Sequence, residues 1–251
     1  MAFVLHYSGT VMIQVALNGT RTRVEHAAIP LTPAEQAAEA RASVAAGASA
    51  IHVHVRDEYG NESLAPGDVA KALDAIRASC DGIPIGLGTG AWIVPDLRRR
   101  LSVIRSWTTL PDFASVNLHE AGSAQVIELL LERGIGVEAG IWNAPAAVSL
   151  IKSGLADNCL RILLEPAEAS CSAKANLLQM EDVLIGVTPP RLLHGMGHCA
   201  WHLIELAAKR HYDTRTGFED TLRLPDGTLA VSNADLVSAA RSLVERTVLH
   251  A

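Results

Sequence analysis

Short runs of β-branched and other apolar residues alternate with Ala- and Leu-rich stretches of helical period along the whole chain. Each run has the length of a strand, and a helical stretch follows each of them. The predicted strands are Val11–Leu17, Ala50–Val55, Pro84–Gly88, Phe113–Leu118, Ile135–Ile141, Leu160–Glu165, Arg191–Met196 and Thr214–Glu219.

This repeated strand–helix pattern predicts an α/β protein with a single (β/α)₈ TIM barrel as one domain over residues 1–251. A doubly wound open sheet would need a glycine-rich phosphate loop after the first strand. The turn Asn18-Gly19-Thr20 is too short for such a loop, and no linker divides the chain. The pattern therefore favours the closed barrel.

The first predicted helix has clear boundary signals. Thr32 is expected at the N-cap, Pro33 at the first helical position and Glu35 at the capping-box position. The helix should continue to Ala46 and end at Gly47.

The second predicted strand carries two histidines in strict alternation with apolar residues. His52, His54 and Arg56 share one face of this strand, whereas Ile51 and its apolar partners share the other. The apolar face should pack on helices, so the histidines should point into the barrel. Two imidazoles at positions i and i+2 can chelate one metal ion; the alternative is a hydrogen-bonded pair of barrel histidines.

The last predicted strand and its exit loop carry a carboxylate on the same side. The period of two places Arg215 and Glu219 on one face, and only the first strand separates this strand from the histidine pair. Glu219 would then complete a site of two histidines and one carboxylate, with open positions as in catalytic zinc sites. The alternative is that Glu219 and Asp220 form a solvated turn.

Composition narrows the classes of partner. With 21 Lys and Arg against 27 Asp and Glu, the net charge of −6 argues against a basic nucleic-acid or membrane-surface footprint and favours small-molecule partners. The hydrophobic share of 49% with 4% aromatics predicts an aliphatic core. The four cysteines have no paired spacing, and no run suits a membrane span or an export signal. We therefore expect a cytoplasmic protein.

Further polar residues fall near the carboxyl ends of predicted strands, where barrel enzymes hold their sites. They either line the mouth or support a ligand histidine, and the sequence does not rank them: Asn117, His119, Glu120, Glu138, Glu165 and His194. Three histidines around the helix after the seventh strand are expected at the surface: His198, His202 and His211.

Several segments resemble the β-keto acid cleavage enzymes. The order of His-x-His-x-Arg-Asp and Arg-x-Gly-x-Glu-Asp carries the resemblance. The segments are Asn18–Arg21, Leu31–Glu35, Gly47-Ala48, Ile51–Asp57 and Thr214–Leu222.

The resemblance implies a (β/α)₈ barrel with one zinc ion per chain on His52, His54 and Glu219, and a homo-oligomer. It also implies the reaction: a β-keto acid and the co-substrate acetyl-CoA become acetoacetate and a new acyl-CoA. Arg215 and Asp220 resemble the pair that abstracts the proton. Because a guanidinium with a pKa above about 12 is almost never neutral, Asp220 is the alternative base, with Arg215 steadying the enolate charge.

The chain departs from these relatives at positions that the resemblance assigns to the substrate. Gly88 stands where relatives carry a hydroxyl residue, which leaves Thr89 as the source of a hydroxyl, and Asn117 is the nearest counterpart of a threonine motif. Arg21 replaces a glutamate that recognises an amino group in aminohexanoate-cleaving relatives. We therefore expect a substrate with an acidic or neutral polar tail, unless Arg21 turns outward and pairs with Glu25.

The basic run Arg98–Arg100 lies early in the helix after the third strand, at the active-site end of the predicted barrel. It is a candidate for contact with the CoA phosphates; the alternative is a solvated basic turn.

Two other functions compete with this interpretation. An amidohydrolase-type metal hydrolase also begins with a His-x-His strand, but that class carries it on the first strand and needs more histidines on middle strands. A non-catalytic, metal-stabilised barrel that binds a regulatory ligand would show tight metal binding without turnover.

Overall fold

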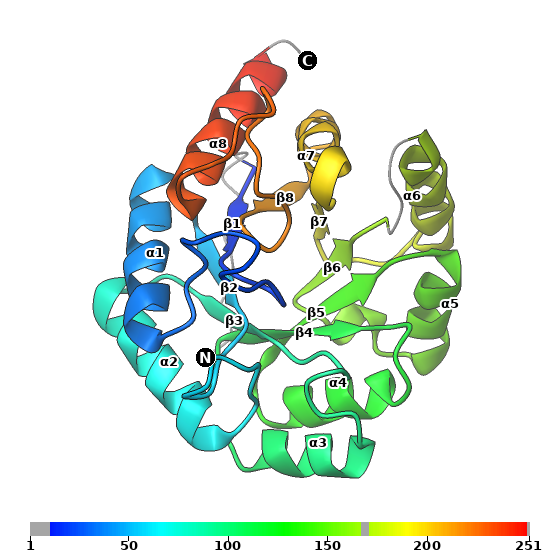
Figure 1. The fold of residues 1–251 in the computed structure, drawn as a ribbon. Coiled ribbons are helices and arrows are strands. Elements are labelled where there is room, and N and C mark those ends of the chain that lie inside the picture. Colours follow the sequence, from blue (N-terminus) through cyan, green and yellow to red (C-terminus); the bar gives the residue numbers. More distant parts are fainter. Residues whose placement is uncertain (1–10, 167–170, 250–251) are drawn as a thin grey trace.

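The computed structural model describes residues 11–166 and 171–249, and eight parallel strands close a barrel within these ranges. Each strand pairs with the next, and β8 pairs with β1, so the predicted (β/α)₈ fold is confirmed (Figure 1). The strands are β1 Ile13–Ala16, β2 Ala50–Val53, β3 Ile85–Gly88, β4 Phe113–Asn117, β5 Gly136–Ile141, β6 Arg161–Leu164, β7 Arg191–Leu193 and β8 Asp213–Thr216.

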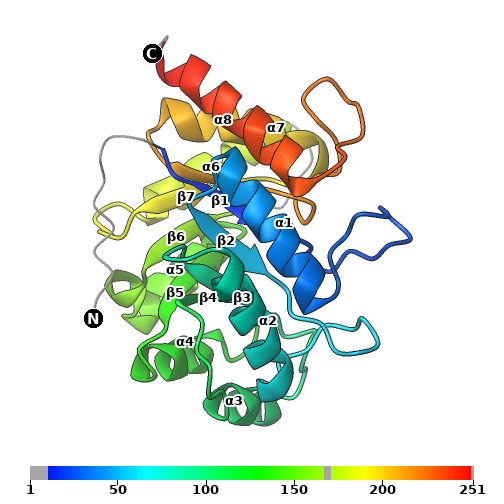
Figure 2. The same ribbon diagram turned by 90° about the vertical axis from the view of Figure 1, so that its left-hand side faces the viewer.

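Helices surround the barrel and alternate with the strands along the chain. The α-helices are α1 Pro33–Ala46, α2 Pro66–Ser79, α3 Leu97–Arg105, α4 Ser123–Glu132, α5 Ala144–Ser153, α6 Cys171–Val183, α7 Ala200–Lys209 and α8 Asn233–Leu249. Short 3₁₀ turns cover Ala156–Asn158 and Gly197–Cys199. The connections after β1 and β2 project from the same end of the barrel (Figure 2).

The boundaries of α1 match the prediction. The Thr32 hydroxyl accepts from the backbone N–H of Glu35, and the Glu35 carboxylate accepts from the backbone N–H of Thr32, which completes the capping box. Gly47 ends the helix with a φ of 120°. These local signals set both ends of α1.

Several predicted strands end earlier in the structure, and two of these differences concern the strands that carry the metal-donor residues. Strand β2 stops at Val53, because the backbone N–H of His54 donates to the side chain of Asn18 and not to a strand partner. Strand β8 stops at Thr216, because Gly217 turns the chain so closely over β1 that an added Cβ would lie 2.1 Å from the Ala16 carbonyl oxygen. The prediction of strand structure through Glu219 is therefore wrong.

The core between strands and helices is aliphatic, as predicted, with Val15, Ile51 and Val53 fully buried. The barrel interior instead holds a polar layer. Gln14 Nε2 donates to Glu138 Oε1 at 2.7 Å, and Arg161 Nε lies 3.2 Å from the same oxygen. Glu138 is fully buried in this layer, so the expectation that it lies near the mouth is wrong.

No helix among the described residues is long and apolar enough to cross a membrane. Cys80 and Cys159 are buried and form no disulfide.

Candidate metal centre and cavity

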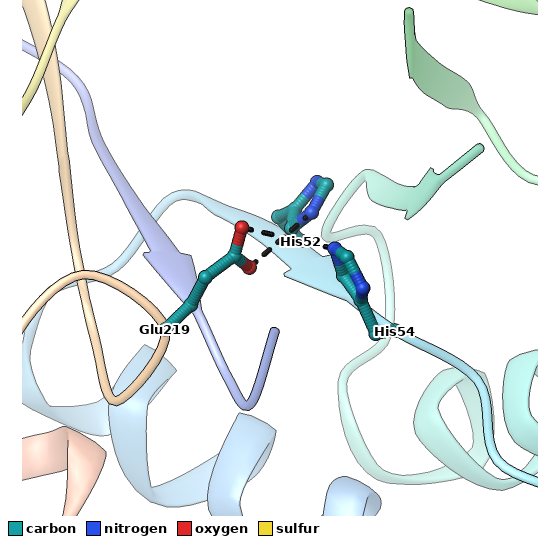
Figure 3. Close-up of side chains that lie close together, drawn as sticks. All are labelled: His52, His54 and Glu219. Carbon is teal, nitrogen blue, oxygen red and sulfur yellow. Dashed lines mark ion pairs between the residues drawn. The ribbon is translucent and has the colours of Figure 1, made fainter. Parts of the chain in front are cut away.

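His52, His54 and Glu219 come together at the carboxyl end of the barrel (Figure 3). His52 lies on β2 opposite Ala16 of β1, His54 directly follows β2, and Glu219 lies in the loop after β8. His52 Nε2 is 3.4 Å from Glu219 Oε2, and His54 Nε2 is 3.7 Å from Glu219 Oε1. One donor atom from each residue lies within 4.8 Å of the others.

The donor set fits a divalent metal ion. Both ring nitrogens of His52 and Glu219 Oε2 are buried and have no hydrogen-bond partner, which is costly unless an ion binds them. Burial lowers the pKa of His52 to about 3 although Glu219 opposes the shift, so the imidazole is neutral and ready to ligate. Two nitrogens and a carboxylate also leave coordination positions open.

Arg215 keeps the carboxylate of Glu219 ionised. Burial acts to raise the pKa of Glu219, but the charge of the nearby Arg215 holds it well below its usual range. Arg215 Nη2 donates to Glu219 Oε1 at 3.1 Å.

Glu62 and Trp92 hold His54 in place, and sequence reasoning missed both residues. The Glu62 carboxylate contacts His54 Nδ1 and accepts a hydrogen bond from Trp92 Nε1 at 3.0 Å. The Trp92 ring lies nearly parallel to the His54 ring, with centroids 6.2 Å apart and 18° between the planes. A carboxylate on the outer nitrogen turns the other nitrogen of a ligand histidine toward the metal.

Arg56, predicted on the same face as the histidines, is not a metal donor and instead stabilises a neighbouring loop. Its backbone bridges to Glu62, and its guanidinium donates to the carbonyl oxygens of Gly19 and Arg21. The residue is buried and holds the loop between β1 and α1.

A cavity of about 330 Å³ opens beside the donor atoms and is lined by both histidines, Glu219 and Arg215. The three residues predicted for substrate contact also line it: Arg21, Thr89 and Asn117. Trp92, Trp142, Glu165 and Met196 add to its wall. The structure thus brings the predicted site residues to one cavity, except for Asp220, which is fully buried behind the wall.

The three residues predicted to contact the substrate each make a polar contact within the protein. Arg21 Nη1 lies 2.8 Å from Glu25 Oε1, the pairing expected as the alternative, but Glu25 also lines the cavity and the pair stays at the mouth. The Thr89 hydroxyl donates to the Ser115 carbonyl oxygen at 2.7 Å. Asn117 Nδ2 donates to a Glu120 oxygen at 3.0 Å.

A chain of charged contacts runs behind the cavity wall. Arg215 donates to both oxygens of Asp220, at 2.7 and 3.2 Å. His194 Nδ1 lies 3.4 Å from Asp220 Oδ1, and His194 Nε2 lies 3.5 Å from Glu165 Oε2. Burial and Arg215 act to lower the pKa of His194. The two facing carboxylates outweigh them and raise it to about 9, which favours the protonated ring.

The absence of a side chain at Gly88 has a steric reason. A Cβ at this position would lie 2.4 Å from His54 Nε2, the nitrogen that faces Glu219. The ring of His54 therefore occupies the space that a hydroxyl residue would need.

The basic run at the start of α3 is only partly available to a ligand. Arg100 is buried and pairs with Glu120 at 3.4 Å, so its predicted contact with CoA phosphates is wrong, whereas Arg98 and Arg99 are exposed. The predicted surface histidines are exposed: His198, His202 and His211.

Comparison with known proteins identifies the family. Residues 10–250 match the model of the beta-keto acid cleavage enzymes. The chain is 27% identical over 246 residues to the 3-keto-5-aminohexanoate cleavage enzyme of Fusobacterium nucleatum subsp. nucleatum, covering 90% of this chain and 88% of that one. It is 28% identical over 259 residues to the 3-oxoadipate:acetyl-CoA acetyltransferase of Cupriavidus necator, covering 93% and 88%.

Among solved structures, the ternary complex of ObcA with a C4-CoA adduct and oxalate superposes with a TM-score of 0.68 at 15% identity. This match covers 87% of the present chain but only 64% of the ObcA chain, and at this identity it shows the shared barrel alone. The match to the family model over residues 10–250 carries the assignment. As the sequence resemblance predicts, the chain belongs to the beta-keto acid cleavage enzyme family.

Proposed function

We propose that this enzyme converts a β-keto acid and acetyl-CoA into acetoacetate and a new acyl-CoA. The observation that carries the proposal is the cluster of metal-donor atoms on His52, His54 and Glu219 at the wall of the cavity, in which the buried nitrogens of His52 and Glu219 Oε2 have no hydrogen-bond partner. The C. necator relative is named for transfer between 3-oxoadipate and acetyl-CoA, which is the same class of reaction.

We assign the metal as zinc, one ion per chain, held by these three residues. Two neutral imidazoles and one carboxylate are a donor set that catalytic zinc sites use. When bound, zinc supplies Lewis-acid polarisation of a carbonyl oxygen.

Two residues beside the metal centre act on the negative charge of the enolate and on the proton that the substrate loses. Arg215 lines the cavity, and despite burial the carboxylates of Asp220 and Glu219 raise its pKa, so its guanidinium stays charged. A permanent cation cannot be a base, so Arg215 stabilises the enolate that forms when the substrate loses a proton. Asp220 holds Arg215 through two hydrogen bonds and, because it is buried behind Arg215, takes part in proton transfer through neighbouring side chains and not by direct contact with the substrate.

Arg21 selects the tail of the substrate. Its guanidinium lies at the cavity mouth, where Nη1 pairs with Glu25 and Nε donates to the Glu219 carbonyl oxygen, and it can also pair with a substrate carboxylate. We therefore propose an acidic or neutral polar tail; 3-oxoadipate, a keto dicarboxylate, has this character. Thr89 and Asn117 contact the substrate from the opposite wall.

We further propose that residues 1–251 act as one catalytic unit in a cytoplasmic homo-oligomer with small-molecule partners and without nucleic acid or membrane. The net charge of −6 supports the absence of a polyanion-binding face.

The test is turnover by the zinc-loaded protein with acetyl-CoA and a panel of β-keto acids, including 3-oxoadipate and an amino-bearing keto acid. Formation of acetoacetate supports the proposal. Hydrolysis without acetyl transfer would favour the metal-hydrolase alternative, and tight zinc binding without turnover would favour the ligand-binding barrel.

A further inference from the structure

Asp220 does not reach the cavity. The residue is fully buried, and the side chain of Arg215 stands between its carboxylate and the cavity and occupies both of its oxygens. A group that exchanges a proton with a substrate must come within hydrogen-bond reach of the reacting carbon. Because Arg215 stays charged and Asp220 lies behind it, another side chain of the cavity must take the proton.

Glu165 is the carboxylate that reaches the same cavity from the neighbouring strands. It directly follows β6, lines the cavity, and keeps 11% of its side chain exposed. His194 directly follows β7 and is fully buried between Glu165 and Asp220, with one ring nitrogen toward each carboxylate. Since β6, β7 and β8 are adjacent in the barrel, their carboxyl ends bring the three residues into line.

We propose that Glu165 is the residue that exchanges the proton with the substrate carbon, and that His194 positions Glu165 and links it to Asp220 and Arg215. This inference rests on the proposed β-keto acid cleavage. It adds a catalytic residue, Glu165, and a positioning residue, His194, to that reaction.

The proton balance closes within the active site. The C–H bond between the keto and carboxylate groups breaks, its electron pair remains on the substrate as the enolate, and the proton forms an O–H bond on Glu165. After acetyl transfer and C–C cleavage, the same O–H bond breaks and the proton returns to the carbon of the departing acetoacetate. No oxidant or further reactant is needed.

Proton exchange can be measured apart from the complete reaction. The zinc-loaded protein is incubated with 3-oxoadipate in deuterium oxide without acetyl-CoA. Proton NMR follows loss of the signal of the methylene group between the keto and carboxylate groups, and the uncatalysed rate is subtracted. In a second assay, kcat and KM are measured with acetyl-CoA. Zinc content is determined for each variant.

Glu165→Gln keeps the shape of the side chain but cannot take a proton. We expect exchange and kcat to fall by roughly 100-fold or more, with KM for 3-oxoadipate and zinc content unchanged. His194→Gln should also lower exchange and leave KM unchanged, because Glu165 stays in the cavity without its positioning partner. Glu205→Gln, which removes an exposed carboxylate of α7, is the control of equal charge and should behave as wild type.

A cavity carboxylate lost by truncation can be replaced from solution. We expect added formate to restore part of the exchange in Glu165→Ala and to have no effect on Glu165→Gln, where the space is filled. A purely structural role for Glu165 would not produce this rescue.

The outcomes separate the two proposals. Wild-type exchange in Glu165→Gln, loss of its zinc, or a raised KM with normal kcat would overturn the inference while acetoacetate formation by wild type still supports the proposed function. The last of these results would make Glu165 a recognition site for a cationic substrate group. A wild-type protein that converts no β-keto acid would overturn both.

Discussion

Replacing Gly88 by Ala should weaken the metal site without touching a metal ligand. An added Cβ would lie 2.4 Å from His54 Nε2, whereas ordinary contacts begin at 3.4 Å, so the ring must retreat by about 1.0 Å. Zinc–nitrogen bonds keep their length to within about 0.2 Å, so this displacement exceeds what the ligand tolerates.

The ring of His54 has little freedom to adapt. Its outer nitrogen contacts Glu62, and Trp92 covers its face, so a shift that relieves the clash also breaks these contacts. Loss of such supporting contacts alone costs about 10- to 100-fold in metal affinity. We expect at least this loss for Gly88→Ala, which corresponds to about 1.4 to 2.8 kcal/mol.

The assay is competition for zinc against a chromophoric chelator, combined with thermal unfolding of the apoprotein. Gly67→Ala is the matched control, because nothing lies within 4 Å of its added Cβ near the start of α2. This control should bind zinc as wild type does and gain up to about 1 kcal/mol in stability. Wild-type zinc affinity in a folded Gly88→Ala variant would refute the assignment of His54 Nε2 as a ligand atom.

Further predictions address the ligands, the proton-handling pair, the CoA contact and the substrate tail. The double variant His52→Ala/His54→Ala should lose its zinc by elemental analysis, and full retention would contradict the donor set. Asp220→Asn should retain zinc and lose roughly 100-fold or more in kcat; a wild-type rate would remove Asp220 from the reaction. Arg99→Glu should raise KM for acetyl-CoA and leave KM for the keto acid unchanged. A wild-type KM for acetyl-CoA in this variant would indicate that Arg99 is solvated and does not contact the CoA phosphates. Arg21→Glu should shift kcat/KM from 3-oxoadipate toward an amino-bearing keto acid, whereas an unmoved ratio would exclude Arg21 from selection.

The fold was predictable because its signals are local. Alternation of apolar runs with helical stretches is visible in the sequence, and the capping box at Thr32 fixed the start of α1. The positions of His52 and His54 followed from the period of a strand, although β2 ends between them.

Glu219 was predicted to join the site for a reason that the structure does not support. The prediction extended strand periodicity past Thr216, whereas the close approach of Gly217 to Ala16 turns the loop and directs Glu219 back over β1. Contacts of this kind depend on the packing of distant segments, which sequence periodicity does not contain.

The residues that support the metal ligands could not be predicted from the sequence, because their contacts also depend on the packing of distant segments. Glu62 contacts His54 because the antiparallel bridge between Arg56 and Glu62 closes the loop after β2, and Trp92 lies in the turn that follows β3. Glu165 and His194 were visible as polar residues at strand ends, but only closure of the barrel shows that they touch. The burial of Arg100 likewise depends on Glu120, which follows a different strand.

The most direct test of the central claim is the fate of the acetyl group. Zinc-loaded protein is incubated with 3-oxoadipate and acetyl-CoA that carries ¹³C in its acetyl group, and the products are analysed by carbon NMR and mass spectrometry. The proposed reaction predicts labelled acetoacetate and an unlabelled new acyl-CoA in equal amounts. Acetoacetate without label, or labelled acetate as the product of hydrolysis, would contradict it.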